Sequence, residues 1–125
     1  MIEKLGNNSL IVIKNGKIIF KSEKDRLRPV VICINDYREE MAGSIVIDKI
    51  VGLAVAKLFI FAEVKEIYAL IASKKAVDYL SGKKIKFEAG KIVEKILNDN
   101  QSEICPMEEL AEKLSEEELF AKLNK

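Results

Sequence analysis

The stretch IVIDKIVGLAVAKLFIFA, residues 45–62, decides the fold because it sets one charged pair between two of the most apolar runs of the chain. The first run, GSIVID at residues 43–48, has the composition of a buried strand. The run that follows Lys49 is hydrophobic on nearly every side, which predicts a helix in the middle of the protein. Asp48 and Lys49 stand at the junction, so this junction is the first candidate for a functional site.

Upstream of this stretch, the sequence predicts a β-hairpin and then a helix. Residues 10–14 and 17–21 are short β-branched strands, and the Asn15-Gly16 pair between them tolerates the positive φ values of a tight turn. Pro29 then suits the first turn of a helix over residues 28–41, whose apolar side chains recur at helical spacing. The β-branched run at residues 30–34 favours a strand instead, and we prefer the helix.

Downstream, strands and helices alternate. Ser73 is placed to cap one helix and Gly82 to end it, while Ser115 and Glu118 form a capping box for the last helix. The predicted elements are a strand at 66–73, a helix at 74–81, a strand at 85–90, a short helix at 91–98, a helix from Pro106 and a helix from Ser115.

This order predicts an α/β protein with three α-β-α layers and a mixed sheet of about five strands that begins with the hairpin. The length of 125 residues suits one domain. We expect its core to span about residues 9–114 and its C-terminal helical tail to span residues 115–125, where the chain packs loosely or on a neighbour.

The composition indicates a globular protein of the cytoplasm. Hydrophobic residues make up 49% of the chain and charged residues 33%, with a net charge of +1. This balance provides no field for phosphate backbones, so we expect no nucleic-acid partner. No apolar run is long enough for a signal peptide or a membrane span, so we expect no membrane association. Two distant cysteines in such a chain are expected to stay reduced.

Histidine is absent from the sequence. This removes the commonest metal ligand, the commonest general base and every histidine-dependent triad. We therefore expect neither a metal nor a cofactor.

The Asp48-Lys49 pair suggests an anion site at the start of the central helix. Asp48 suits the role of helix cap. Lys49 does not suit a first helical turn, because a cation there opposes the helix dipole by about 0.3–1 kcal/mol. A lysine at that place fits better if it holds an anion beside the helix amides, and Gly52 would let a ligand or a neighbouring backbone come close. Gly52 is equally well explained as a packing glycine, which we prefer.

Three further residues are candidates. Cys105 precedes Pro106 at the start of a helix, where the dipole stabilises a thiolate, although Glu108 and Glu109 oppose it. A buried or capping cysteine is the alternative. Ser73 and Glu108 are added as ligand-binding candidates, while Cys33 lies in an apolar stretch and is assigned to packing.

Four blocks of the sequence, LIVIKNGKIIFKS, IVIDKIVGLAVAKL, FEAGKIVEKILN and ICPMEE, resemble a family of uncharacterised bacterial and archaeal proteins, domain-of-unknown-function family 1893. The similarity covers residues 10–114, and its more specific marks are the DK.VG block at Asp48 and the CPMEE block at Cys105. The resemblance implies a cytidine-deaminase-like fold. It implies no assigned activity.

The resemblance to a deaminase-like fold invites comparison with zinc deaminases, and the sequence departs from their zinc-ligand pattern. Those enzymes hold zinc between two helix N-termini, with His-x-Glu on one and Pro-Cys-x-x-Cys on the other. Here the corresponding helices offer residues 48–50 and residues 105–108, with one thiol and a carboxylate, which do not make three zinc ligands. A zinc-dependent deaminase is disfavoured. If the layout of the superfamily holds, the resemblance implies that Asp48, Lys49 and Cys105 converge.

Three functions compete at this stage. The first is binding of a nucleotide-like or other anionic metabolite at Lys49 and the two helix starts. The second is a thiol enzyme with Cys105 as nucleophile, Lys49 holding its thiolate and Asp48 in support. The third is an interaction module that forms a homo-oligomer through the apolar residues Leu119, Phe120 and Leu123 of the tail. The sequence fixes no reaction.

Overall fold

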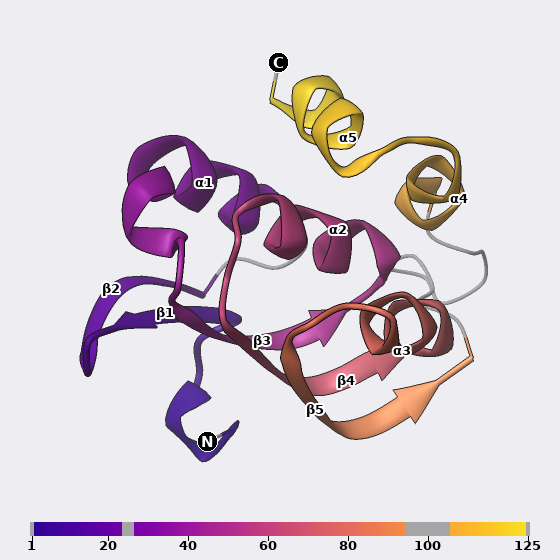
Figure 1. The fold of residues 1–125 in the computed structure, drawn as a ribbon. Helices are drawn as coiled ribbons and strands as arrows, with labels where there is room; N and C mark the ends of the chain where they lie inside the picture. The colour runs from indigo at the N-terminus through magenta and orange to yellow at the C-terminus, as the bar shows by residue number, and fades with distance from the viewer. Residues whose placement is uncertain (1, 24–26, 95–105, 125) are drawn as a thin grey trace.

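The computed structural model describes residues 2–23, 27–94 and 106–124 and, for residues 106–109, the backbone alone. The chain folds into one sheet with helices stacked against it (Figure 1). The elements are η1 (Ile2–Leu5), β1 (Leu10–Lys14), β2 (Lys17–Ser22), α1 (Arg28–Met41), β3 (Ile45–Val51), α2 (Leu53–Phe61), β4 (Glu66–Ser73), α3 (Lys74–Ser81), β5 (Lys86–Val93), α4 (Pro106–Lys113) and α5 (Glu116–Leu123).

The sheet has five strands in the order β2-β1-β3-β4-β5. Strand β1 is antiparallel to both of its neighbours, whereas β3, β4 and β5 are parallel to one another. The predicted mixed sheet with an N-terminal hairpin is therefore confirmed. One consequence of this order is that every strand except β1 points in the same direction, so four strands end at one edge of the sheet.

The two faces of the sheet are covered unequally. All five α-helices contribute to the main core on one face, from Val30 in α1 to Leu119 in α5. The opposite face holds a smaller cluster of Leu5, Ile11, Ile13, Ile47 and Tyr68, which the 3-10 helix η1 covers. Of the two predicted helical layers, one therefore contains all five α-helices, and the other contains the short 3-10 helix η1.

Helix α2 lies at the centre of the helical layer, as the sequence predicts. Six of its nine residues are buried. Its one charged residue, Lys57, is half-buried, and its ammonium group donates a hydrogen bond of 2.7 Å to the carbonyl oxygen of Leu114. Although α2 is apolar, no helix among the described residues has the length and hydropathy needed to cross a membrane.

The C-terminal helix α5 is part of the core, so the predicted core boundary at residue 114 is wrong. The side chain of Leu119 is fully buried. Phe120 stacks on Phe61 of α2 with ring centroids 4.9 Å apart, and the hydroxyl of Tyr79 in α3 donates a 2.5 Å hydrogen bond to Glu116. Leu119 is buried, and Phe120 and Leu123 are half-buried and pack against the chain's own core. Self-association through the tail stays a prediction.

The predicted helix over residues 91–98 is wrong at its start, because β5 continues to Val93. Lys91, Ile92 and Val93 pair with the last residues of β4, and this ladder outweighs the helical spacing of the segment. Glu94 lies beyond the strand, and the remainder of the predicted helix lies outside the described residues.

The regular pairing of the parallel strands is interrupted along one row. The register passes from Asp48–Ala69 to Ile50–Ile71 and from Ala69–Ala89 to Ile71–Lys91, so the row of Lys49, Leu70 and Gly90 is skipped. The alternation of side chains between the two faces shifts at this row. In β3, Val46 and Val51 both lie in the main core although they are five residues apart, and in β4 the same holds for Ala69 and Ala72, which are three apart. In a regular strand, residues at an odd separation point to opposite faces. A Cβ on Gly90 would lie 3.0 Å from the Leu70 carbonyl oxygen.

Helix α2 ends in a Schellman motif whose left-handed position holds a glutamate. Glu63 has a φ of 61°. Its amide donates a hydrogen bond to the carbonyl oxygen of Ile60, and the amide of Val64 donates one to the carbonyl oxygen of Phe59. The buried side chains of Val64 and Phe59 supply the apolar contact that usually accompanies the motif. Glycine is the usual residue at this position because it has no Cβ to clash with the backbone.

Replacing Glu63 with glycine should therefore stabilise the protein. We expect Glu63→Gly to raise the free energy of unfolding by about 0.5–1 kcal/mol, because relief of the left-handed strain exceeds the entropy that glycine adds to the unfolded chain. Urea denaturation measures the change. Glu63→Ala is the matched control, since it removes the carboxylate and keeps the Cβ. An equal gain in both variants would show that charge, and not backbone strain, was responsible.

Removing the buried leucine of α5 should destabilise the whole domain. We expect Leu119→Ala to lower the free energy of unfolding by about 2–5 kcal/mol, through lost burial and the cavity left behind. Glu117→Ala, an exposed position on the same helix, should change it by less than about 0.5 kcal/mol. Both are read from denaturant midpoints. Similar midpoints for the two variants would mean that α5 does not belong to the cooperative core.

Candidate functional site

The carboxyl edge of the sheet gathers the starts of three helices. Strands β2, β3 and β4 all end there, and α1, α2 and α3 follow them directly in the chain. Figure 1 shows the β3 and β4 arrows pointing to the edge where α2 and α3 begin and where α4 lies nearby. In open α/β sheets, ligands bind beyond the carboxyl ends of the strands. This edge is therefore the candidate functional site.

Asp48 and Lys49 both lie within β3, so the prediction that they begin the central helix is wrong. Asp48 is buried, with 7% of its surface exposed, whereas Lys49 is exposed. Successive strand residues point to opposite faces, which places Asp48 on the side of Val46 and the main core and Lys49 on the opposite side. The dipole argument for an anion at Lys49 loses its basis, because Lys49 is in no helical turn.

Gly52, and not Asp48, stands at the N-cap position of α2. A carboxylate oxygen of Asp48 accepts a 3.3 Å hydrogen bond from the amide of Ile50 within the strand. Gly52 has extended backbone angles and no side chain with which to cap the helix, and α2 begins at Leu53. Because pairing with β4 holds the chain in the strand as far as Val51, the helix starts four residues later than Lys49.

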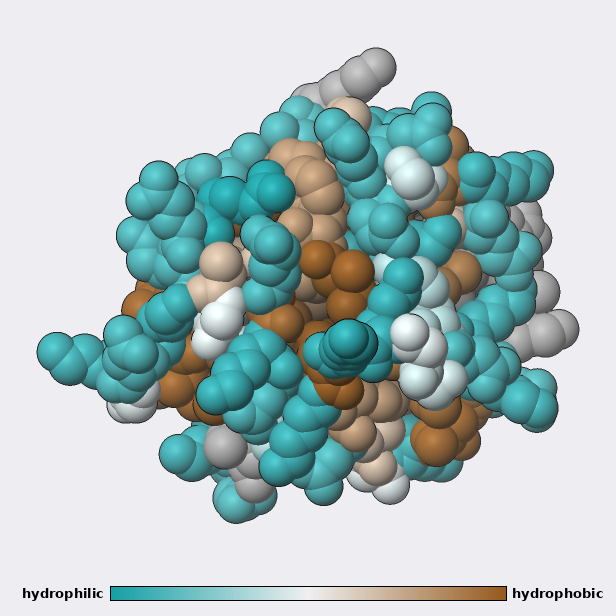
Figure 2. All heavy atoms as spheres, viewed as in Figure 1, coloured by the Kyte–Doolittle hydropathy of each residue, from teal (hydrophilic) through white to brown (hydrophobic). Residues whose placement is uncertain are grey.

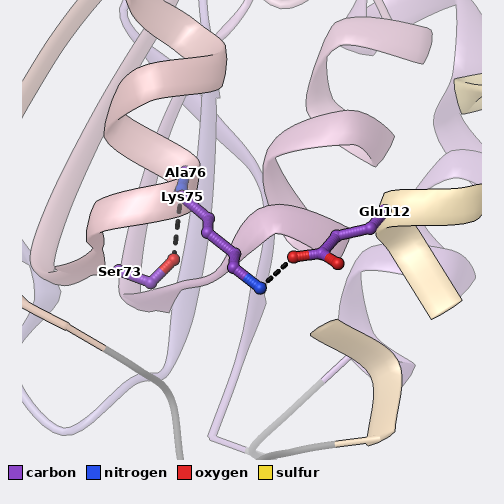
Figure 3. A network of polar contacts seen from close by, with 4 residues as sticks. All are labelled: Ser73, Lys75, Ala76 and Glu112. Carbon is purple, nitrogen blue, oxygen red and sulfur yellow. Dashed lines mark hydrogen bonds and ion pairs between the residues drawn. The ribbon is translucent and has the colours of Figure 1, made fainter. Parts of the chain in front are cut away.

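Ser73 caps α3, as the sequence predicts. Its buried hydroxyl oxygen accepts a 3.2 Å hydrogen bond from the amide of Ala76 (Figure 3). Lys75, in the first turn of α3, forms an ion pair with Glu112 of α4, and Figure 3 shows its side chain extending from one helix to the other. Since Val51 pairs with Ala72, the next residues, Gly52 and Ser73, lie at neighbouring positions of the edge.

The predictions for the two cysteines have different outcomes. Cys33 lies in α1 and is fully buried, which confirms its assignment to packing. Burial raises the pKa of its thiol to about 12, and the nearby charges of Asp36 and Glu40 act in the same direction. Cys105 lies outside the described residues, and so does the side chain of Glu108 in α4. The proposed convergence of Cys105 with Asp48 and Lys49, and the thiol-enzyme alternative that depends on it, stay predictions.

Two cations that sequence reasoning did not single out for a site stand at the helix starts. Arg28 is the first residue of α1 and Lys74 is the first residue of α3, and both are exposed. The signal that pointed to Lys49, a cation in a first helical turn, applies to these two residues instead. Among the described residues no group of three histidine, cysteine, aspartate or glutamate side chains is arranged to hold a metal.

Comparison with known proteins assigns the chain to a family. The model of a domain of unknown function, DUF1893 (TM1506), matches residues 2–125. The chain belongs to this family. The solved structure of a DUF1893 family protein from Thermotoga maritima is 28% identical, with a TM-score of 0.87 over 98% of this chain and 82% of that one. No curated protein matches the chain.

The fold of this DUF1893 chain also resembles RibD of Acinetobacter baumannii. Two RibD structures, form 1 and form 2, give TM-scores of 0.54 and 0.52 at 20% and 17% identity. They cover 90% and 93% of this chain, but the chain spans only 32% and 33% of the RibD chain. RibD contains a deaminase-like fold, so the likeness confirms the predicted fold class and reaches no further.

The buried thiol should be inert towards alkylation. With its pKa raised to about 12, Cys33 stays protonated at neutral pH, and only the thiolate reacts quickly. We expect a Cys105→Ser variant, in which Cys33 is the one remaining thiol, to take up no iodoacetamide when folded and one equivalent in urea, as counted by mass spectrometry. Labelling of the folded variant at the rate of an unstructured cysteine peptide would contradict the burial of α1 against the core.

Proposed function

We propose that the chain binds a small nucleotide-like or other anionic metabolite at the carboxyl edge of β3 and β4, without zinc chemistry. The observation that supports this proposal is the buried carboxylate of Asp48 in the strand that leads into α2, a helix whose N-cap position is held by a glycine. Such a ligand has hydrogen-bond donors at one end and negative charge at the other, and the edge offers groups that suit both.

The hydrogen-bond donors of such a ligand would bind to the carboxylate of Asp48. An ionised carboxylate is costly to bury unless hydrogen bonds satisfy it, and buried charged groups are concentrated at functional sites. The carboxylate accepts a hydrogen bond from the amide of Ile50, and its two oxygens can accept several hydrogen bonds at once. An amino group or ring N–H of a ligand would form a charge-assisted hydrogen bond with the same carboxylate.

The anionic end suits the helix starts. The first amides of a helix have no acceptor within the helix, and the helix dipole favours negative charge near them. The residues at the N-cap positions of α1 and α2, Leu27 and Gly52, form no side-chain capping hydrogen bond. Arg28 in the first turn of α1 and Lys74 in that of α3 add positive charge at the same edge. Lys75 is less suited, because Glu112 already neutralises it.

The absence of zinc from this proposal rests on the sequence. The chain has no histidine and two cysteines, of which Cys33 is buried in the main core. Three protein ligands of the kinds that hold zinc in deaminases are not present.

A calorimetric screen tests the proposal. Nucleoside monophosphates, diphosphates and triphosphates and phosphorylated sugars are titrated into the wild-type protein, and any binder is then measured with variants. We expect Asp48→Asn to weaken binding by at least about tenfold, through loss of a charge-assisted hydrogen bond. Arg28→Ala should weaken binding of the phosphorylated form more than that of the parent nucleoside.

Lys49→Ala is the matched control, because Lys49 neighbours Asp48 in sequence and lies on the other face of the sheet. It should bind like the wild type. Loss of binding in Lys49→Ala with retention in Asp48→Asn would place the ligand on the wrong face and overturn the proposal. The same holds if none of these compounds binds the folded wild-type protein.

A further inference from the structure

Strand β5 forms an outer edge of the sheet (Figure 1). Among the residues that the structure describes, it pairs with β4 alone, so the other side of its backbone presents N–H and C=O groups to which a further strand can bind. In Figure 2, hydrophobic side chains show at the surface in the lower right of the view, where Figure 1 places this strand. One apolar side chain of β5, that of Ile92, is 56% exposed.

The side chains of β5 divide irregularly between the face that carries the α-helices (the helix face) and the face that η1 covers in part (the η1 face). Residues that pair across a ladder share a face. Phe87 and Ile92 pair with main-core residues of β4, so both lie on the helix face, although an odd number of residues separates them. Glu88 pairs with Tyr68 of the η1-covered cluster, and Lys91 directly precedes Ile92, so Glu88 and Lys91 lie on the η1 face.

Because of the skipped row, this order is the same when it is counted from either end of the strand. Outward from the peptide bond that precedes Gly90, Phe87 corresponds to Ile92 on the helix face, and Glu88 corresponds to Lys91 on the η1 face. Residues directly opposite in an antiparallel pair must share a face. A regularly alternating strand cannot pair with itself about a point between two residues, whereas β5 can. Gly90 has no side chain to conflict with this register.

From this arrangement we infer that β5 pairs with β5 of a second copy of the chain. A two-fold axis perpendicular to the sheet makes the two strands antiparallel and joins the two sheets into one. Glu88 of each copy is then opposite Lys91 of the other, so opposite charges meet twice, and Lys86 is opposite Val93. Cross-strand pairs of opposite charge stabilise a sheet, and two-fold dimers are the commonest oligomers. This inference does not depend on the proposed ligand.

Helix α3, which packs on β4 and β5, turns an uncharged flank towards this edge. Lys75 forms an ion pair with α4, and Tyr79 donates a hydrogen bond to α5, so this flank of α3 faces the other helices. Val77 and Ser81 lie on the opposite flank, because a separation of two residues turns a helix by about 200°. Two copies of α3 can therefore approach across the axis without bringing like charges together.

The other outer edge, β2, lacks this complementarity. Its sequence, KIIFKS, contains Lys17 and Lys21 and no carboxylate. Two copies of β2 would add cations to the seam without anions to balance them, and lysines on an edge strand oppose such pairing. The charges therefore favour β5 over β2 as the edge that a second copy occupies.

Sedimentation equilibrium from low to high micromolar concentration tests the dimer. The wild-type chain should approach twice the monomer mass. Ile92→Asp should raise the dissociation constant by at least about tenfold, because it sets a carboxylate opposite Phe87 of the other copy. Ile18→Asp is the matched control, since Ile18 is equally exposed, at 56%, on the other edge strand, and it should dimerise like the wild type.

Charge reversal gives a second arm. Glu88→Lys and Lys91→Glu each set like charges opposite one another at two places, so each should raise the dissociation constant by about tenfold, and the double variant should restore the wild-type value. A wild-type chain that stays monomeric at every concentration overturns the inference. So does a folded Ile92→Asp variant that dimerises as tightly as Ile18→Asp, or a double variant that is as weak as both single variants.

Discussion

The burial of α2 is the constraint on which the rest of the structure depends. A nine-residue helix with six buried side chains must be covered on every side, and complete burial of a leucine or phenylalanine stabilises the fold by about 1.5–3 kcal/mol. The parallel strands cover one side, α1 and α3 flank it, and α4 and α5 close the remainder. Lys57, the one charge on this helix, reaches a backbone carbonyl at Leu114, so even its polar atom is satisfied by the covering segment.

The elements that sequence reasoning predicts correctly are those specified by local chemistry. Asn15 and Gly16 both have the positive φ values of the predicted hairpin turn, Ser73 caps α3, and Ser115 forms the predicted capping box with Glu118. Each signal depends on residues a few positions apart, so it survives without knowledge of the fold. The buried central helix follows equally well from the sequence, because a helix that is apolar on all sides has no alternative to burial.

The elements that sequence reasoning predicts wrongly are those that depend on pairing with residues distant in the chain. The end of β3 is fixed by pairing with β4 as far as Val51, and that pairing moves the start of α2 away from Lys49. Pairing with β4 likewise draws Lys91 into β5. Gly52 and Ser73 lie at neighbouring positions of the carboxyl edge, and Arg28 and Lys74 stand at helix starts, whereas sequence reasoning placed Lys49 at one. The remainder of the site prediction stays a prediction.

Two connections at the carboxyl edge are so short that they limit how this edge can change. One residue, Gly52, joins β3 to α2, and none separates β4 from α3. An insertion at either junction would detach a helix start from the strand that fixes it, so these junctions tolerate exchange of side chains but not remodelling of the backbone. Diversification of this scaffold at these two junctions must therefore proceed by point substitution.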